Sequence, residues 1–174
     1  AAQHNAPPQW CEMIQQQIQS MEYEVGTQTD REAAGQSDAL QAPNRANKFR
    51  VYFTNTGLRL TPRAAAGAAW EWGMELIAFG TTSQLPAVPP PVLSRTAQDN
   101  RVEYARTGAL TEWYRNSKDG LEQGFSILEK PPGDGALVLD LAVTGCLVPR
   151  LQASENAIAF FSTSGMVVLT YAKL

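Results

Sequence analysis

The 174-residue chain contains a single histidine, His4, and lacks several motifs that would define an active site. Catalytic arrangements of the Ser-His-Asp or Cys-His kind need a histidine held in place, whereas His4 lies in a polar N-terminal tail. There is no GxSxG motif, and Gly133-Asp134-Gly135 is a turn without the lysine and helix that follow a phosphate-binding loop. These absences argue against nucleophilic hydrolysis and against a phosphate-binding loop.

Clustered positive charge and long apolar runs are also missing. The 14 Lys and Arg residues are scattered among 17 Asp and Glu residues, for a net charge of -3. Nucleic acids and anionic membranes attract clustered cations, so we expect no nucleic-acid partner. No apolar run approaches the roughly 20 residues that cross a bilayer, so we expect no membrane insertion. The start, Ala1-Ala2-Gln3, looks like the product of cleavage at a small-residue site, which favours secretion.

Cysteine is limited to Cys11 and Cys146. Their separation does not fit a CxxC motif, and two cysteines without suitable histidines are too few for structural zinc, so we expect no metal and no cofactor. Two interpretations remain. The pair forms a disulfide that ties the N-terminal segment to the sheet, or both are buried apolar thiols. Secretion favours the disulfide.

Strand-forming residues in alternation with polar residues dominate what is present. The stretch 101–132 places such residues between turn signals at Thr107-Gly108, Asp119-Gly120 and Pro131-Pro132, which predicts an antiparallel meander. A second pattern over 48–63 turns at Asn55-Thr56-Gly57 and predicts a hairpin.

These patterns predict one all-β domain over 1–174, an antiparallel β-sandwich of roughly nine to eleven strands with one N-terminal amphipathic helix. The predicted segments are a helix over 7–25, a loop over 26–47, a hairpin and strand over 48–80, a proline-rich loop over 81–100 and a β meander over 101–174.

The predicted helix has one apolar stripe that needs a cover. Trp10, Ile14, Ile18 and Met21 recur at near-helical spacing, with glutamines and Glu12 opposite. We favour burial of the stripe on the domain's own sheet. The alternative is that these four residues form an interface with a partner.

Carboxylates beside aromatic residues are the remaining candidates for chemistry. Glu103 and Glu112 are predicted to face each other across the Thr107-Gly108 hairpin, with Trp113 and Tyr114 nearby. Two carboxylates about 5 to 10 Å apart are the requirement of a glycosidase, and aromatic rings stack on sugars. We favour the other interpretation, in which acidic residues on a solvated sheet face pair with arginines on neighbouring strands.

Several phrases in this order resemble a known family. They are LQAPNRANKFRVYFTNTGLRLTPR, WEWGMELIAFG, RVEYARTGALTEWYRNSKDGLEQGFSILEKPP, and an ending from LVLDLAVTGCLVPRL to GMVVLTYAKL. Together they cover most of 40–174 and resemble the N-terminal domain of large bacterial secreted proteins that carry FG-GAP-like or other β-propeller-type repeats downstream. The runs 41–46 and 112–125 are the most specific. The resemblance implies an extracellular or cell-surface protein and a β-sandwich-like module, and it transfers no catalytic residue.

We therefore expect a non-enzymatic extracellular or cell-surface structural or interaction module. Its expected partners are proteins, either further copies or the repeat domains of a longer chain. The alternative is a carbohydrate-binding module or a two-carboxylate glycoside hydrolase, with a glycan as partner. A third interpretation is an assembly subunit, in which the stripe within 10–21 or an edge strand docks onto the next copy.

Overall fold

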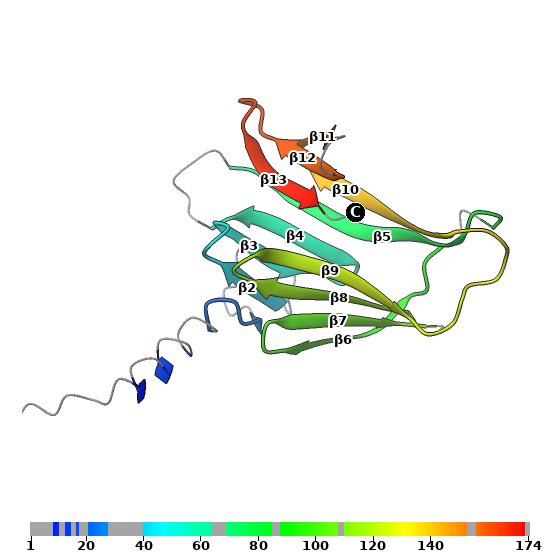
Figure 1. Cartoon of the computed structure of the whole chain (residues 1–174), viewed down its shortest axis with the longest axis horizontal. Coiled ribbons are helices and arrows are strands. Elements are labelled where there is room, and N and C mark those ends of the chain that lie inside the picture. The colour runs from blue at the N-terminus through cyan, green and yellow to red at the C-terminus, as the bar shows by residue number, and fades with distance from the viewer. Residues whose placement is uncertain are drawn as a thin grey trace, which may run out of the picture.

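The computed structural model describes residues 9–10, 13–14, 17, 21–27, 40–63, 69–84, 88–107, 110–152 and 156–172. This part of the chain is mainly β and forms three antiparallel sheets, which confirms the predicted all-β class (Figure 1). It contains thirteen strands, more than predicted. They are β1 (Gly26–Thr27), β2 (Leu40–Asn44), β3 (Phe49–Phe53), β4 (Gly57–Pro62), β5 (Trp72–Thr81), β6 (Val92–Gln98), β7 (Arg101–Arg106), β8 (Leu110–Ser117), β9 (Gly120–Ile127), β10 (Leu137–Gly145), β11 (Val148–Gln152), β12 (Ala157–Phe161) and β13 (Val167–Ala172).

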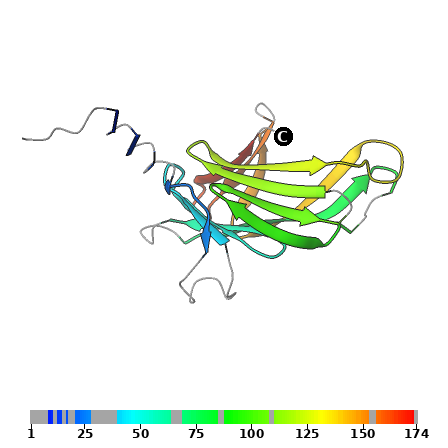
Figure 2. The ribbon, with the colours of Figure 1, turned by 90° about the horizontal axis from the view of Figure 1, so that it is seen from below.

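Two of the sheets share one apolar core. The six-stranded sheet has the order β1-β2-β3-β4-β5-β10, and the four-stranded sheet has the order β6-β7-β8-β9. Figure 2 shows the second lying across the first. Phe53 of the six-stranded sheet packs against Tyr114 of the four-stranded sheet with ring centroids 5.8 Å apart, and Tyr104 meets Tyr114 edge-on at 6.0 Å. These buried rings hold the two layers together.

The third sheet, which we call the small sheet, has the order β11-β12-β13. It rises beyond β10 in Figure 1. Phe160 of β12 is buried and meets Trp72 of β5 edge-on, with ring centroids 5.2 Å apart. The small sheet is therefore packed onto the rest of the protein through one of its two faces.

The predicted hairpin over 48–63 is confirmed by β3 and β4. Val51 pairs with Leu60 and Phe53 pairs with Leu58, and all four side chains are buried. The alternation of apolar and polar residues fixed this register because a shift by one residue would expose the whole apolar row.

The predicted meander over 101–174 is correct only for its first part. Strands β7, β8 and β9 pair in sequence, but β10 crosses to the other layer and pairs with β5. Strands β11 to β13 then form the small sheet. Alternation predicts strands and faces, but it carries no information on which distant strand is the neighbour.

The predicted loop over 26–47 is wrong at both ends, because β1 and β2 lie within it. The run LQAPN of β2 shows no alternation, and Pro43 argues against a central strand. The register explains the proline. Strand β1 pairs with Leu40 and Gln41, so Pro43 lies beyond the end of β1 and, among the described residues, has a neighbouring strand on one side alone.

The predicted proline-rich loop over 81–100 is also wrong in part, because β6 occupies 92–98 and pairs with β7. Strand β6 is an edge strand, it is largely exposed, and its register shifts between Val92 and Ser94. Because β6 has a bulge and no row of buried side chains, its sequence does not alternate between apolar and polar residues.

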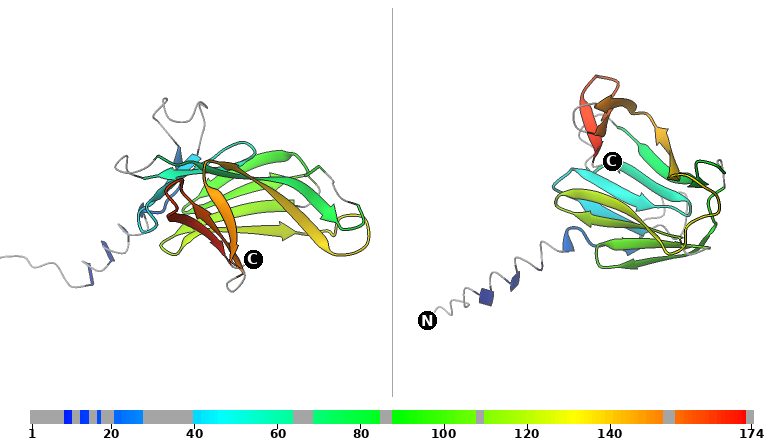
Figure 3. Two further views of the ribbon diagram at one scale, coloured as in Figure 1. Left: turned by 90° about the horizontal axis from the view of Figure 1, so that it is seen from above. Right: turned by 45° about the vertical axis from the view of Figure 1, so that its right-hand side comes forward.

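The predicted helix over 7–25 lies largely outside the described residues and is not supported. Ile18 is among the residues outside them, whereas the side chains of Trp10 and Met21 are described and more than half exposed. The described residues before Glu22 lie away from the sheets (Figure 3). Burial of the apolar stripe on the domain's own sheet is therefore not seen for Trp10 and Met21.

Candidate functional site

The four-stranded sheet places the predicted site residues on opposite faces. In the register of β7, β8 and β9, Tyr104 pairs with Glu112, and Glu103 pairs with Trp113. Glu112 and Tyr114 point into the core and are fully buried, whereas Glu103 and Trp113 lie on the outer face. The predicted Glu103–Glu112 pair does not share a cleft, and Trp113 and Tyr114 do not form one platform. The sequence prediction placed β7 and β8 one residue out of register. A shift of one residue moves a side chain from one face of the sheet to the other.

Glu112 is the centre of a buried polar network. Its carboxylate accepts hydrogen bonds from Arg106 Nη2 at 2.8 Å, from the Tyr114 hydroxyl at 2.5 Å and from Gln123 Nε2 at 3.0 Å. Arg106 also donates to the Pro90 carbonyl at 3.1 Å, and its Nε has no partner. The ion pair is 5% and 0% exposed at the two side chains, so the carboxylate is stabilised by these donors in place of water.

The network reaches from the four-stranded sheet to the small sheet. The Tyr171 hydroxyl of β13 donates to Gln123 Oε1 of β9 at 3.0 Å, and Gln123 in turn donates to Glu112. Tyr171 is the polar link between β13 and the buried carboxylate. It fixes the orientation of β13 over the end of the core.

Burial and the nearby carboxylate raise the pKa of the network tyrosines. Burial raises the pKa of Tyr114 well above its usual value, and the charge of Glu112 raises it further. Burial is also the main cause that raises the pKa of Tyr104, whose hydroxyl is 2.8 Å from the Gly57 carbonyl. The pKa of Tyr171 is raised by burial and then by Glu112. Protonated tyrosines donate hydrogen bonds here, and the geometry suits a structural network around a fully buried carboxylate.

The outer face of the same sheet is polar and laterally paired. Arg101 lies over the ring of Trp113 at 4.2 Å from its centroid and pairs with Glu103 at 2.7 Å. The far edge of the Trp113 ring lies over Gly124 of β9, where an added Cβ would stand 2.1 Å from Cζ2. A sugar could stack on this ring only by displacing Arg101, because the guanidinium covers it.

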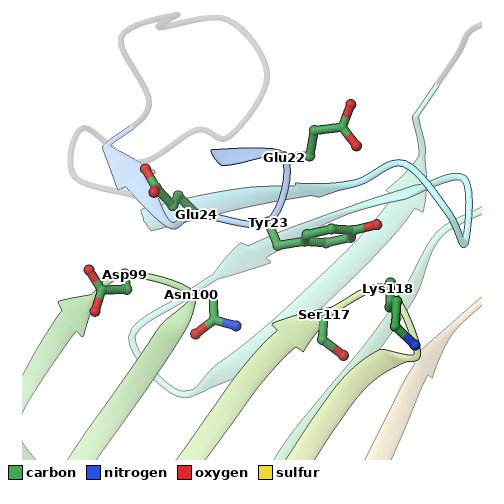
Figure 4. Close-up of a pocket in the computed structure, with 7 residues that line it drawn as sticks. All are labelled: Glu22, Tyr23, Glu24, Asp99, Asn100, Ser117 and Lys118. Atoms are coloured by element: carbon green, nitrogen blue, oxygen red, sulfur yellow. The ribbon is translucent and has the colours of Figure 1, made fainter. Parts of the chain in front are cut away.

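A groove of about 710 Å³ opens at one end of the two layers (Figure 4). One wall is the segment Glu22, Tyr23 and Glu24, and the other consists of turn residues that join strands of the four-stranded sheet. The lining residues from these turns are Asp99, Asn100, Ser117 and Lys118. The groove was missed by sequence reasoning because its walls come from three segments far apart in the chain.

Buried asparagines hold the first wall of this groove in place. Asn116 Nδ2 donates to the Tyr23 carbonyl at 3.0 Å and to the Pro43 carbonyl at 2.8 Å, and its Oδ1 accepts from Asn44 at 2.8 Å. Asn44 and Asn116 are fully buried. These bonds join β2, β8 and the N-terminal segment, so the asparagines act as a polar clamp between the layers.

The hydrogen bonds of the groove's charged residues are on the surface. Lys118 pairs with Asp119 at 2.7 Å, a contact that raises the pKa of Lys118, and Glu22 pairs with Arg45 at 2.7 Å. Such exposed pairs contribute little to stability. The groove is acidic because three of its lining residues, Glu22, Glu24 and Asp99, are negatively charged and one, Lys118, is positively charged.

A smaller hollow of about 200 Å³ lies on the outer face of the six-stranded sheet. Gly57 and Gly73 are among its lining residues, and Arg59, which also lines it, pairs with Glu71 at 3.3 Å. Arg59 also lies 5.1 Å from the ring centroid of Tyr52. This surface resembles the outer face of the four-stranded sheet, since its charges are paired laterally.

Cys146 is exposed, so it is not the buried apolar thiol of the second interpretation, and its sulfur accepts a hydrogen bond from the Glu71 amide at 3.4 Å. Cys11 lies outside the described residues, so the disulfide stays a prediction.

Within the described ranges, no three His, Cys, Asp or Glu side chains come together as metal ligands would. No helix in the described part of the chain is long and apolar enough to span a membrane.

The small sheet carries apolar side chains on both faces, which sequence reasoning also missed, although Arg150 lies over the ring of Phe161 on the outer face. Its inner face carries Phe160 and Ile158, packed against the core. On the opposite face Val148, Phe161 and Val167 are directly paired across the three strands, and we call them the outer apolar row. Val148 is 51% and Val167 is 57% exposed. The signal was present in the sequence, because Arg150 is the single charged residue of these three strands.

Comparison with known proteins found no relatives. No family model matches the chain, and neither a curated protein nor a solved structure matches it.

Proposed function

We propose that this chain is a non-enzymatic interaction module of an extracellular or cell-surface protein, and that it binds a protein partner through the small sheet. The observation that carries the proposal is the outer apolar row. A sheet whose two faces are both apolar is typical of a sheet covered on both sides, and here one side is uncovered among the described residues. The extracellular location is supported by the family resemblance, and the sandwich-type module is supported by that resemblance and by the two sheets that share a core.

The buried network supports a structural role over a hydrolytic one. Glu112 is fully buried and its oxygens are already bonded to Arg106, Tyr114 and Gln123. A general acid must reach the proton acceptor of its substrate. Glu103 is on the other face of the sheet and is engaged by Arg101. The glycan alternative would have to use Trp113, whose ring is covered by Arg101.

The test compares two variants that gain the same charge on exposed apolar positions. One is Val148→Lys with Val167→Lys, on the outer apolar row. The other is Val88→Lys with Leu93→Lys, whose side chains are 88% and 68% exposed but lie outside the small sheet. Light scattering of the purified wild-type chain over a concentration series measures self-association, and a glycan array measures sugar binding.

We expect association of the wild-type chain to rise with concentration, to fall in the outer-row variant, and to persist in the control variant. A lysine pair would have to be desolvated in an apolar contact, which is unfavourable. Equal association of both variants would overturn the assignment of the contact surface. A chain that is monomeric at every concentration and binds glycans through Trp113 would replace the proposal by the carbohydrate-binding alternative.

A further inference from the structure

Two apolar surfaces of this chain are uncovered among the described residues. One is the outer apolar row of the small sheet. The other lies on the N-terminal segment, where the side chains of Trp10, Met13 and Met21 are 51%, 61% and 58% exposed. Large apolar side chains that gather at a surface are typical of sites that bind something. Each of the two surfaces therefore needs a cover.

The outer apolar row is flanked by a thiol and a cation. Cys146 lies two residues before Val148, Arg150 lies two residues after it, and all three are exposed. The guanidinium of Arg150 lies over the ring of Phe161, and the ion pairs of the described residues do not include it. This margin of the small sheet therefore offers a thiol, an apolar side chain and a cation without a carboxylate partner.

The N-terminal segment carries a counterpart for each of these three groups. Trp10, Cys11 and Glu12 are consecutive in the sequence. Cys11 is the only other cysteine of the chain, and Glu12 is the only Asp, Glu, Lys or Arg among residues 1–21. Cys11 and Glu12 lie outside the described residues, so the correspondence is one of sequence. An apolar row alone accepts many partners, whereas a matching charge and a matching thiol distinguish this segment from them.

We propose that the N-terminal segment of one copy of this chain covers the outer apolar row of a second copy. In this contact Trp10 lies on the row, Glu12 pairs with Arg150, and Cys11 lies beside Cys146. The inference rests on the proposed function and names its partner. Burial of Trp10 and of the exposed valines stabilises the contact, and the ion pair sets its register.

The direction of the N-terminal segment favours a second copy over the same chain. The Tyr23 carbonyl accepts a hydrogen bond from Asn116 at 3.0 Å, and the Val25 amide donates to the Asp99 carbonyl at 2.8 Å. These bonds hold the segment at the acidic groove, and the described residues before Glu22 lead away from the sheets (Figure 1). The segment would have to reverse its direction to reach its own small sheet, whereas another copy meets it as it stands.

The first experiment exchanges the two charges of the proposed ion pair. Sedimentation equilibrium under reducing conditions gives the dissociation constant of the wild-type chain, of Glu12→Lys, of Arg150→Glu and of the variant with both changes. We expect each single reversal to raise the constant about fivefold, because it places like charges together, and the double variant to return to within about twofold of wild type.

The matched control combines Glu12→Lys with Lys118→Glu. Lys118 is exposed, lies outside the small sheet, and pairs with Asp119. This variant has the same net charge as the exchange of Glu12 and Arg150, and we expect its association to stay as weak as that of Glu12→Lys alone. Recovery in the control would show that only the overall charge matters and would overturn the pairing of Glu12 with Arg150.

The second experiment separates contact between copies from contact within one chain. A chain with Cys146→Ser keeps only Cys11, and a chain with Cys11→Ser keeps only Cys146, so neither can form the disulfide alone. The two are mixed with oxidised glutathione, and one carries a tag that changes its mass. Oxidised glutathione takes two electrons and two protons from the two thiols and leaves as two molecules of glutathione. We expect mixed covalent dimers on a non-reducing gel well beyond the share that random pairing gives, and Glu12→Lys to remove the excess.

The outcomes separate this inference from the proposed function. If Val148→Lys with Val167→Lys prevents association while the charge reversals and the thiol mixture show no preference, the contact surface stands and the N-terminal segment is not its occupant. A wild-type chain that stays monomeric and joins Cys11 to Cys146 within one molecule would show that the segment covers its own row, which overturns the second copy. Mixed dimers at the random share would overturn it as well.

Discussion

The outer faces of the four-stranded sheet and of the small sheet differ in kind. On the four-stranded sheet, Arg101, Glu103 and Trp113 contact one another, and Arg115 approaches Glu122 at 3.9 Å on the same face. On the small sheet the corresponding positions are the outer apolar row, with Arg150 4.5 Å from the ring centroid of Phe161 as the one charge. A face that stays in water satisfies its charges laterally, whereas a face of valine and phenylalanine gains free energy when it is covered. The two faces therefore separate solvent-facing surface from candidate contact surface.

The inner faces differ in the opposite direction. The four-stranded sheet buries the ion pair of Arg106 and Glu112, whereas the inner face of the small sheet is apolar apart from the Tyr171 hydroxyl. A buried network fixes one arrangement of its partners but is costly to leave incomplete. The four-stranded sheet is thus completed on both faces by the described residues, and the small sheet on one.

The largest expected loss of stability comes from a substitution on the buried face of the four-stranded sheet. Glu112→Ala should lower the free energy of unfolding by about 3 to 5 kcal/mol, because it leaves Arg106 buried without its counter-ion. Urea unfolding followed by circular dichroism measures the change. The matched control is Glu103→Ala on the outer face, whose side chain is 44% exposed, and we expect less than about 1 kcal/mol there. Similar losses in both variants would contradict the distinction between the two faces.

The second prediction concerns how Trp113 closes the outer face. Gly124→Ala places a methyl group where Trp113 Cζ2 lies, so the ring must leave its position over β9. We expect a loss of about 1 to 3 kcal/mol in unfolding free energy and a shift in tryptophan fluorescence. Gly26→Ala in β1 is the control, since nothing lies within 4 Å of the added Cβ. An unchanged fluorescence spectrum in Gly124→Ala would show that the ring does not depend on the glycine.

The third prediction follows from the raised pKa of the buried tyrosines. In the unfolded chain tyrosines lose their protons near pH 10, whereas in the folded protein the raised pKa of Tyr114 and of Tyr104 keeps them protonated. Above pH 10 the unfolded state therefore binds fewer protons, and stability falls as pH rises. Each such tyrosine should contribute a slope of about 1.4 kcal/mol per pH unit, and stability should show no loss from them below pH 9.

Tyr114→Phe tests the origin of that slope. The variant should show a shallower decline of the unfolding free energy above pH 10, measured by urea unfolding at a series of alkaline pH values. Its stability at neutral pH should be lower than wild type, because Glu112 loses one of its donors. A decline as steep as that of wild type would assign the alkaline sensitivity to other groups.

Alternation in the sequence predicted the strands whose two faces differ, and it failed where both faces are alike. Val51 and Leu60 of the hairpin could be assigned to the core because their polar neighbours mark the other face, whereas Tyr114 was a candidate for sugar binding beside Trp113 and is fully buried. Strand β6 is exposed on most of its residues, and β2 contains Pro43, so neither shows a period of two. The register across the turn after Thr107 was misjudged by one residue, which moved Glu112 from the core to an imagined cleft.

The crossover of β10 and the acidic groove lie beyond what a single sequence can predict. Leu139 and Leu141 of β10 pack against the core, but nothing in the sequence of β10 identifies β5 as its neighbour. The clamp of Asn44 and Asn116 joins residues 72 positions apart. Such contacts follow from the packing of the layers and not from any local pattern.

The smallest expected change in stability is also the most direct test of the comparison between the two outer faces. Val148→Thr with Val167→Thr makes the outer apolar row polar at nearly constant volume, and Thr111→Val makes one position on the outer face of the four-stranded sheet apolar. Because the two valines are about half exposed, we expect less than about 0.5 kcal/mol change at each position. Fluorescence of anilinonaphthalene sulfonate, which reports exposed apolar surface, should fall in the double variant and stay at the wild-type level or rise slightly in Thr111→Val. Dye binding that does not respond to the loss of both valines would mean that the outer apolar row is covered in solution, and the small sheet would then be a completed layer like the four-stranded one.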